Sequence, residues 1–214
     1  VGVHPIFLFE KGKFMSKLKG VLAGVVTISL GMLLAACGNG NSSSKSAAQS
    51  GTLNLSTTAP LDTIAISKST GFGQTGNVFE SFYRLGKNGK PTAGLAKTGT
   101  VSKDGKTWTF KIRDSKWSNG DPIVAQDFVY SWRRSLNPKT ASPYAYLFSG
   151  VKNADAIIAG KKSPNALGIS APDKKTVVVK LNRPIAYFRV FMAYPLFGPQ
   201  NEKVVKKYGN RYAT

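Results

Sequence analysis

A low-complexity stretch over residues 38–51 limits where a folded region of this chain can begin. It contains Ser, Asn, Gly, Ala and Gln with a single charged residue, Lys45. Such a segment buries too little apolar surface to offset the entropy lost when it becomes ordered. We therefore expect a flexible tether over these residues, with the folded part beginning near Thr52, where apolar and polar residues alternate as in a strand.

A short apolar run precedes this tether over residues 21–36, after Lys17 and Lys19. Basic residues followed by an apolar run and small residues are typical of a secretory signal. A transmembrane helix needs about 20 apolar residues, which is more than this run supplies. The run ends in the sequence Leu34, Ala35, Ala36, Cys37, which resembles a bacterial lipobox. The resemblance implies a signal peptide over 15–36, cleavage before Cys37, a lipid group on its thiol, and a tether over 37–51.

Residues 1–14 fit this layout poorly because the signal pattern begins at Met15 and the chain begins at Val1. Our hypothesis is that residues 1–14 are a translated leader and not part of the natural protein. Peptide mapping of the native precursor tests it, and any peptide from these residues would contradict it.

The sequence contains little catalytic chemistry. The single histidine is His4, in the proposed leader, and the single cysteine is Cys37. A metal site of His and Cys ligands and a His-based nucleophilic triad are therefore excluded from the mature segment. Most carboxylates occur where turns or helix starts are expected, including Asp104, Asp121 and Asp173. We predict that the chain is not an enzyme and uses no cofactor and no metal.

The chain is strongly basic, with a formal net charge of +20. A basic excess can indicate a nucleic-acid partner, but these lysines and arginines are scattered through expected turns and strands as single residues or short pairs. We therefore predict no nucleic-acid partner. A positive field outside a cell instead favours retention near an anionic membrane surface.

The apolar pattern predicts a mixture of helices and hairpins. Val78, Phe82 and Leu85 form one stripe of a helix over 74–85, ended by Gly86. Phe128, Trp132 and Leu136 mark a helix over 125–136. The predicted hairpins cover 99–112, with its turn at Asp104-Gly105, and 167–181. Further helices are expected over residues 154–159, 184–192 and 202–208.

Three blocks of sequence resemble one family. They are Trp117–Pro122, Asp127–Trp132 and Ser142–Tyr146, and they are similar to the oligopeptide-binding lipoproteins of ABC importers, which are extracellular solute-binding proteins of family 5. The resemblance implies an α/β (mixed α+β) fold with the type II architecture of periplasmic binding proteins. This architecture would be incomplete: residues 52–79 begin domain I, residues 80–214 form the small adjoining domain, and the second lobe is missing.

The resemblance also implies a function. The protein would capture short oligopeptides in an extended conformation and deliver them to an ABC permease, from a lipid anchor on the outer face of a Gram-positive cell membrane. The loop from Lys68 through Ser69, Thr70 and Gly71 would pair with the peptide backbone, and Tyr144 would contact the peptide. Two other interpretations remain open: Ser69–Gly71 as an ordinary surface loop, and Tyr144 as a half-buried packing aromatic.

Two alternative functions also remain open. The chain could be a surface receptor for peptides or pheromones, or an adhesin, of the same fold. It could also be a truncated remnant that binds no peptide, because a single lobe cannot close around a ligand. One departure from the family concerns stability: Val124 stands where members usually have Thr, and loss of that N-cap weakens the helix start by about 1 kcal/mol.

Overall fold

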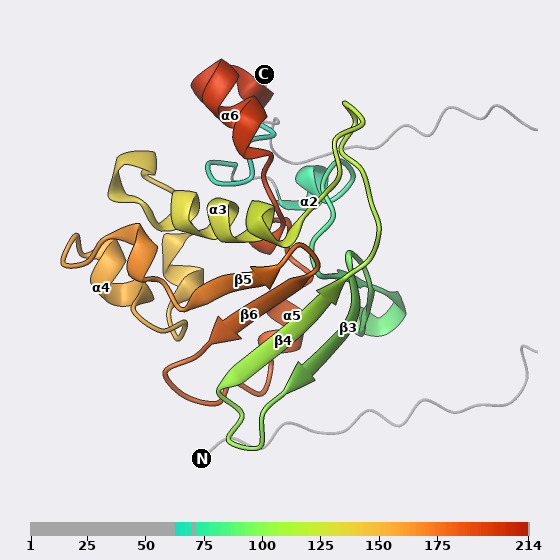
Figure 1. Ribbon diagram of the computed structural model, residues 1–214, viewed down its shortest axis with the longest axis vertical. Coiled ribbons are helices and arrows are strands. Elements are labelled where there is room, and N and C mark those ends of the chain that lie inside the picture. Colours follow the sequence, from blue (N-terminus) through green and yellow to red (C-terminus); the bar gives the residue numbers. More distant parts are fainter. Residues whose placement is uncertain (1–62, 70–71, 214) are drawn as a thin grey trace, which may run out of the picture. The chain divides into compact units, whose positions relative to one another are not determined.

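A four-stranded antiparallel sheet organises the fold (Figure 1). The computed structural model describes residues 63–69 and 72–213, which belong to one unit. The sheet has the order β3-β4-β6-β5 and a smaller sheet pairs β1 with β2. The strands are β1 Tyr83–Leu85, β2 Pro91–Ala93, β3 Ala96–Val101, β4 Thr107–Ile112, β5 Ile169–Asp173 and β6 Thr176–Lys180.

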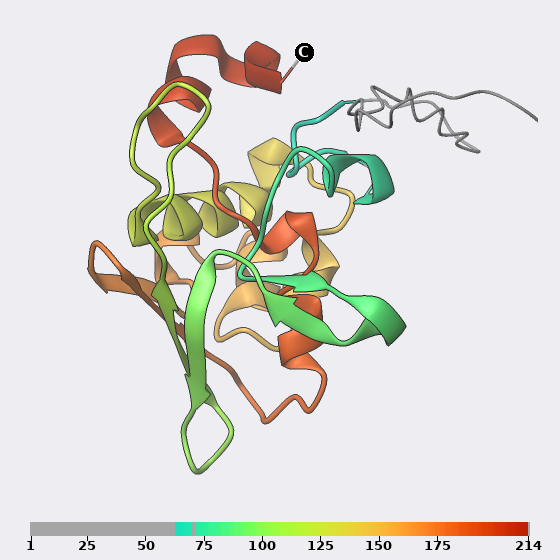
Figure 2. The same ribbon diagram turned by 90° about the vertical axis from the view of Figure 1, so that its right-hand side faces the viewer.

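The described residues include five α-helices. They are α2 Phe72–Thr75, α3 Ala125–Leu136, α4 Ala154–Ile158, α5 Phe188–Phe191 and α6 Glu202–Tyr208. Helix α3 packs against β5 and β6, and α5 packs against β1. Figures 1 and 2 place α6 at one end of this unit and the turn between β3 and β4 at the other. Within the described residues, no helix is long and apolar enough to cross a membrane.

Both predicted hairpins are confirmed. Strands β3 and β4 pair through a turn in which Gly105 has a φ of 70°, a left-handed conformation that favours glycine. Asp104 Oδ1 accepts a hydrogen bond from the Lys106 N–H at 3.0 Å. In β4, the alternation of Trp108, Phe110 and Ile112 gives one buried face. The second hairpin pairs β5 with β6. Turn residues in the sequence were therefore sufficient to predict the positions of both hairpins.

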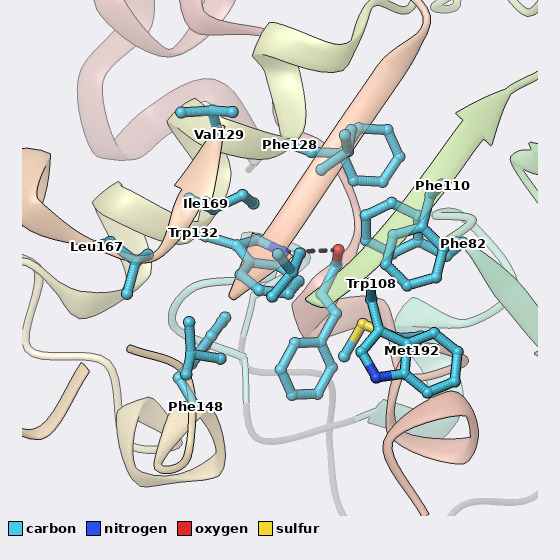
Figure 3. Packing of buried hydrophobic residues seen from close by; sticks show 14 of the residues in the cluster. Phe82, Trp108, Phe110, Phe128, Val129, Trp132, Phe148, Leu167, Ile169 and Met192 are labelled. Carbon is cyan, nitrogen blue, oxygen red and sulfur yellow. Dashed lines mark hydrogen bonds between the residues drawn. The ribbon is translucent and has the colours of Figure 1, made fainter. Parts of the chain in front are cut away.

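The core is centred on aromatic rings from α3, β4 and the residue before β1 (Figure 3). The Phe82 ring centroid lies 4.3 Å from that of Phe110 and 4.3 Å from that of Phe128. Trp132 is fully buried, and its Nε1–H donates to the Phe197 carbonyl oxygen at 2.9 Å. This bond satisfies the polar atom of the indole, which otherwise makes burial of tryptophan costly.

Helix α3 has the predicted bounds, 125–136. At its start the Val124 side chain has no hydrogen-bonding atom, but Asp127 Oδ2 accepts a bond from the Val124 N–H at 3.0 Å. The acid in the first turn therefore supplies half of a capping box. At the other end Asn137 and Pro138 stop the helix, as predicted.

The helix predicted over 74–85 is wrong. Helix α2 ends at Thr75, and residues 83–85 form strand β1. Val78 is 61% exposed and Leu85 50% exposed, so the expected apolar stripe does not exist, while Phe82 is fully buried. A Cβ on Gly94 would lie 2.7 Å from the Ser81 carbonyl oxygen. Glycine therefore lets the chain after β2 approach residues 81–82, and this pairing between distant residues replaces the helix.

The remaining helix predictions have mixed outcomes. Helix α6 has the predicted bounds and is ended by Gly209 at a φ of 59°, and α4 is one residue shorter than expected. The helix predicted over 184–192 is wrong in extent, because α5 covers only 188–191. Its apolar content reflects burial of Phe188 and Met192 in the core, since a fully buried segment is apolar in any conformation.

Candidate functional site

Two cavities border residues 78–82, which we call the linking segment. The larger cavity has a volume of about 1050 Å³ and the smaller about 710 Å³, and Val78, Phe79 and Glu80 line both. The larger cavity is also lined by residues 113–119 and by residues of α6. The smaller cavity is also lined by β1 and residues 193–195. Ligand sites in proteins are concave and combine apolar walls with a few polar groups, so this is the candidate site.

The backbone of the linking segment is only partly paired. The Ser81 carbonyl accepts from the Leu95 N–H at 2.9 Å, and the Phe82 carbonyl accepts from the Ala96 N–H at 2.9 Å. Within the described residues, the N–H groups of Glu80, Ser81 and Phe82 donate to no acceptor. The Ser81 hydroxyl is also buried without a hydrogen-bond partner. Buried backbone groups are nearly always paired, so these donors are candidates for pairing with groups outside the described residues.

Glu80 supplies the charge at the junction of the two cavities. Its carboxylate forms ion pairs with Arg84 and with Arg113, whose Nη2 lies 2.6 Å from Oε2. The Glu80 side chain is 18% exposed. Arg113 also donates from Nε to the Gly94 carbonyl at 2.8 Å. Arg113 therefore connects the linking segment both to the end of β4, which it follows in the sequence, and to Gly94, the glycine that approaches the linking segment.

Trp117 forms part of the wall of the larger cavity. Its Nε1–H donates to Asp127 Oδ2 at 3.1 Å, the oxygen that also caps α3. Burial raises the pKa of the Asp127 carboxyl above its ordinary value of 3.8, and the bonds from Val124 and Trp117 oppose this rise. The orientation of the indole is thus fixed by the first turn of α3.

A buried polar network holds residues 63–69 against α3. Gln200 Nε2 donates to Ser67 Oγ at 2.7 Å and to Ser131 Oγ at 2.9 Å. The Tyr212 hydroxyl donates to Gln200 Oε1 at 2.8 Å. Burial raises the pKa of Tyr212 to about 12, so this hydroxyl stays protonated and remains a donor. Gln200 and Tyr212 also line the larger cavity.

Of the ligand-binding residues predicted from the sequence, the structure describes Ser69 and Tyr144. Ser69 is fully buried and its N–H donates to the Ala65 carbonyl at 2.9 Å. Tyr144 is half-buried, with its ring centroid 6.1 Å from that of Tyr146, and it lines neither cavity. Thr70 and Gly71 lie outside the described residues, as do Leu34, Ala35, Ala36, Cys37, residues 1–14 and the tether. The ligand roles of Ser69 and Tyr144 remain predictions.

Sequence reasoning missed the linking segment because it assigned residues 74–85 to a helix, in which each N–H would be bonded internally. The signal that could have revealed it is the Asn88-Gly89 turn. An Asn-Gly pair between two apolar or alternating runs is a strong hairpin signal, and β1 and β2 do pair on either side of it. Recognition of that hairpin would have removed residues 83–85 from the helix.

Comparison with known proteins identifies the family. Residues 90–214 match the model of the bacterial extracellular solute-binding proteins, family 5, middle region. The chain belongs to this family. It is 41% identical over 194 residues to a dipeptide-binding protein of Lactococcus lactis subsp. cremoris, and the match covers 90% of this chain and 34% of that protein.

Solved structures agree with this assignment. The structure of Listeria monocytogenes OppA bound to peptide matches with a TM-score of 0.71 and 42% identity, over 75% of this chain and 33% of that one. The pheromone receptor PrgZ matches with a TM-score of 0.67 and 35% identity, over 70% and 31%. The predicted mixed α/β fold, an incomplete type II periplasmic-binding-protein-like architecture, is confirmed. The chain spans about one third of the length of these relatives.

Proposed function

We propose that this chain is part of the substrate-binding component of an ABC importer that captures short oligopeptides in an extended conformation and delivers them to a permease. The family assignment supports a solute-binding role, and the relatives include a dipeptide-binding protein and an OppA bound to peptide. These relatives are named as binding proteins and not as enzymes, which agrees with the predicted lack of catalytic activity.

The linking segment is the observation that carries the proposal. An extended peptide can bind as an added strand, with its backbone paired to protein backbone, which gives affinity with little dependence on peptide sequence. Successive side chains of such a peptide point to opposite faces. The unpaired N–H groups of residues 80–82 supply the backbone donors, and the two cavities beside them offer room for side chains. Ser69, Thr70, Gly71 and Tyr144 remain proposed as further contacts.

A backbone substitution tests this assignment. Because the chain spans a third of its relatives, residues 55–214 would replace the matching part of Listeria OppA. An α-hydroxy acid at position 81 keeps the shape of the chain and removes the N–H donor, while Ser81→Ala keeps the donor and serves as control. We expect the ester to weaken peptide binding about five-fold, equivalent to about 1 kcal/mol for one hydrogen bond, in calorimetric titrations. Equal affinity of the ester and control proteins would contradict the proposal.

Membrane attachment is a separate part of the proposal. We propose that Cys37 carries a lipid anchor after cleavage behind Leu34, Ala35 and Ala36, on the outer face of the cell membrane. The intact mass of native protein from the membranes of the producing cells tests it. A mass that includes acyl groups on Cys37 would support the anchor, and a mass without them would contradict it.

The pheromone receptor PrgZ supports a second candidate, a peptide or pheromone receptor of the same fold. Both candidates would use the same site, so binding assays do not separate them. Growth on peptides as the sole source of amino acids, measured with and without the gene, separates the two candidates. Loss of growth without the gene indicates import, and unchanged growth favours the receptor.

A further inference from the structure

The two cavities beside the linking segment differ in charge. The described residues that line the smaller cavity include one carboxylate, Glu80, and one cation, Arg84, and these two form an ion pair. The larger cavity is lined by two carboxylates and four cations. The cations are Arg113, Lys116, Lys203 and Lys207. The larger cavity therefore has an excess of positive charge that the smaller cavity lacks.

Both carboxylates of the larger cavity, Glu80 and Asp114, already have cationic partners. Glu80 pairs with Arg84 and with Arg113. Asp114 Oδ1 lies 2.8 Å from the Nζ atom of Lys175, which does not line the cavity. Neither carboxylate is therefore left to neutralise the remaining cations of the cavity wall.

These remaining cations are Lys116, Lys203 and Lys207, which we call the cavity lysines. Among the described residues, no carboxylate forms an ion pair with any of them. Lys203 and Lys207 are four residues apart on α6, so they share one face of that helix. The acid of the same helix, Glu202, pairs with Lys206 instead. The cavity lysines are therefore available to an anionic group that enters the larger cavity.

The chain around the cavity lysines is held in place. Lys116 lies in the loop before α3, where the Ile123 N–H donates to the Ser115 carbonyl at 2.9 Å. The Lys207 ammonium lies 5.0 Å from the centroid of the Tyr208 ring, a cation–π contact that leaves its charge unchanged. Figure 1 shows this loop and α6 projecting from the same end of the unit. The Ser115 hydroxyl, which has no hydrogen-bond partner, belongs to the same cavity wall.

An extended peptide beside the linking segment would present alternate side chains to the two cavities, because successive side chains of a strand point to opposite faces. A side chain in the larger cavity would meet the cavity lysines, whereas its neighbours would meet the paired charges of the smaller cavity. The volume of about 1050 Å³ leaves room for a long side chain. Attraction between an ammonium and a carboxylate is stronger in a cavity partly shielded from water than in bulk solvent.

We propose that the larger cavity selects an acidic side chain, Asp or Glu, at one position of the bound peptide through the cavity lysines. This inference rests on the proposed peptide-binding function, and it adds one charge preference to binding that otherwise depends little on peptide sequence. Concavity beside the linking segment distinguishes the cavity lysines from other exposed cations. Lys103, Lys106 and Arg183, for example, line neither cavity.

The experiment uses the protein in which residues 55–214 replace the matching part of Listeria OppA, so that the chain is tested within a complete binding protein. Tetra-alanine is compared with peptides that carry Glu, Gln or Lys at one position in turn, all with the same free termini. Gln has nearly the shape of Glu without its charge, so the ratio of the two affinities measures the effect of the side-chain carboxylate alone. Calorimetric titration gives each affinity.

We expect Glu to bind about five-fold more tightly than Gln at one position, or at two positions separated by one residue. At the neighbouring positions, whose side chains would point to the smaller cavity, Glu and Gln should bind equally. The preference should decrease as salt is added, because salt screens charges near the surface.

Two triple variants assign the preference to the cavity lysines. K116E/K203E/K207E should reverse it, so that Lys binds more tightly than Glu, and K116Q/K203Q/K207Q should abolish it. The matched control K103E/K106E/R183E makes the same change in net charge as the first variant, at exposed positions outside both cavities, and should preserve it. Circular dichroism measures the folding of each variant.

Equal binding of Glu and Gln at every position would overturn the inference and leave the peptide-binding function intact. A preference of the same size at all positions, or one changed equally by the cavity and control variants, would also overturn it, because the net charge of the protein would then be the cause. Binding of no peptide at all would overturn the proposed function and this inference with it.

Discussion

The linking segment and the sheet are built by different kinds of interaction. In the sheet, each hairpin joins residues close in sequence, and turns such as Asp104-Gly105 set the pairing. At the end of the linking segment the contacts are with distant residues: Phe82 packs on Phe110 and Phe128, and its carbonyl accepts from the Ala96 N–H. The comparison shows that each hairpin follows from local chemistry, whereas the candidate site, like the β4–β6 pairing that joins the two hairpins, is held by contacts between distant residues.

The strongest test asks whether the linking segment belongs to the core as fully as the sheet does. Phe82→Ala and Phe110→Ala each remove a fully buried ring, and each should destabilise the protein by about 3–5 kcal/mol. Urea unfolding measures both changes, and Tyr146→Ala, at a side chain 61% exposed, is the control. A cost below about 1 kcal/mol for Phe82→Ala alone would show that the segment is only loosely attached.

A smaller effect is expected where the strand after β2 approaches the linking segment. In Gly94→Ala the new methyl group would lie 2.7 Å from the Ser81 carbonyl and 2.9 Å from that of Phe82. Because these atoms belong to the backbone, the segment must shift, and we expect a loss of about 1–3 kcal/mol. Thermal unfolding measures it, with the neighbouring exposed change Ala93→Ser as control. Unchanged stability would mean that the close approach is not required.

Asp127 connects the start of α3 to the wall of the larger cavity, because its carboxylate caps α3 and accepts a hydrogen bond from Trp117. Asp127→Ala leaves the N–H groups of Val124 and Trp117 without this acceptor, and should cost about 2 kcal/mol. In Asp127→Asn the amide oxygen can accept both bonds, so the loss should be smaller. Urea unfolding of both variants measures the difference, and equal losses would contradict the assigned role of the oxygen.

The same residue predicts a pH dependence. The folded state raises the pKa of Asp127 above 3.8, so folding favours the protonated carboxyl. This contribution to stability is present below pH 3.8 and is lost as the pH rises through the folded-state pKa. The stability of Asp127→Asn relative to the natural protein should therefore increase over that rise. Unfolding measured from below pH 3.8 to neutral pH tests it, and a constant difference would contradict the prediction.

The smallest effect concerns the start of α3. Val124 has no side-chain acceptor for the first turn, and Val124→Thr supplies a hydroxyl that can accept from the Asp127 N–H. We expect a gain of about 1 kcal/mol in urea unfolding. Val124→Ala, which adds no acceptor, is the control, and an equal change in both variants would show that the cap is not formed.

The sequence predicted both hairpins and the helices α3 and α6 well, and it predicted the linking segment poorly. Helices α3 and α6 have the predicted bounds because their apolar spacing and end signals lie within the helix itself. Both hairpins followed from their turns. The linking segment was assigned to a helix because Val78, Phe82 and Leu85 have helical spacing, although two of them are exposed. Tyr144 was placed in the site by resemblance, and the structure puts it in neither cavity.

By itself the sequence determined the mixed α/β fold, the hairpins, the principal helix and the family, because each depends on residues close together or on blocks that are specific in their order. The tertiary structure decided which backbone donors are left unpaired at residues 80–82. This property depends on Gly94, which lets a strand that is distant in the sequence approach residues 81–82. Contacts between residues far apart in the sequence leave no periodic pattern along it, so only the folded chain reveals them.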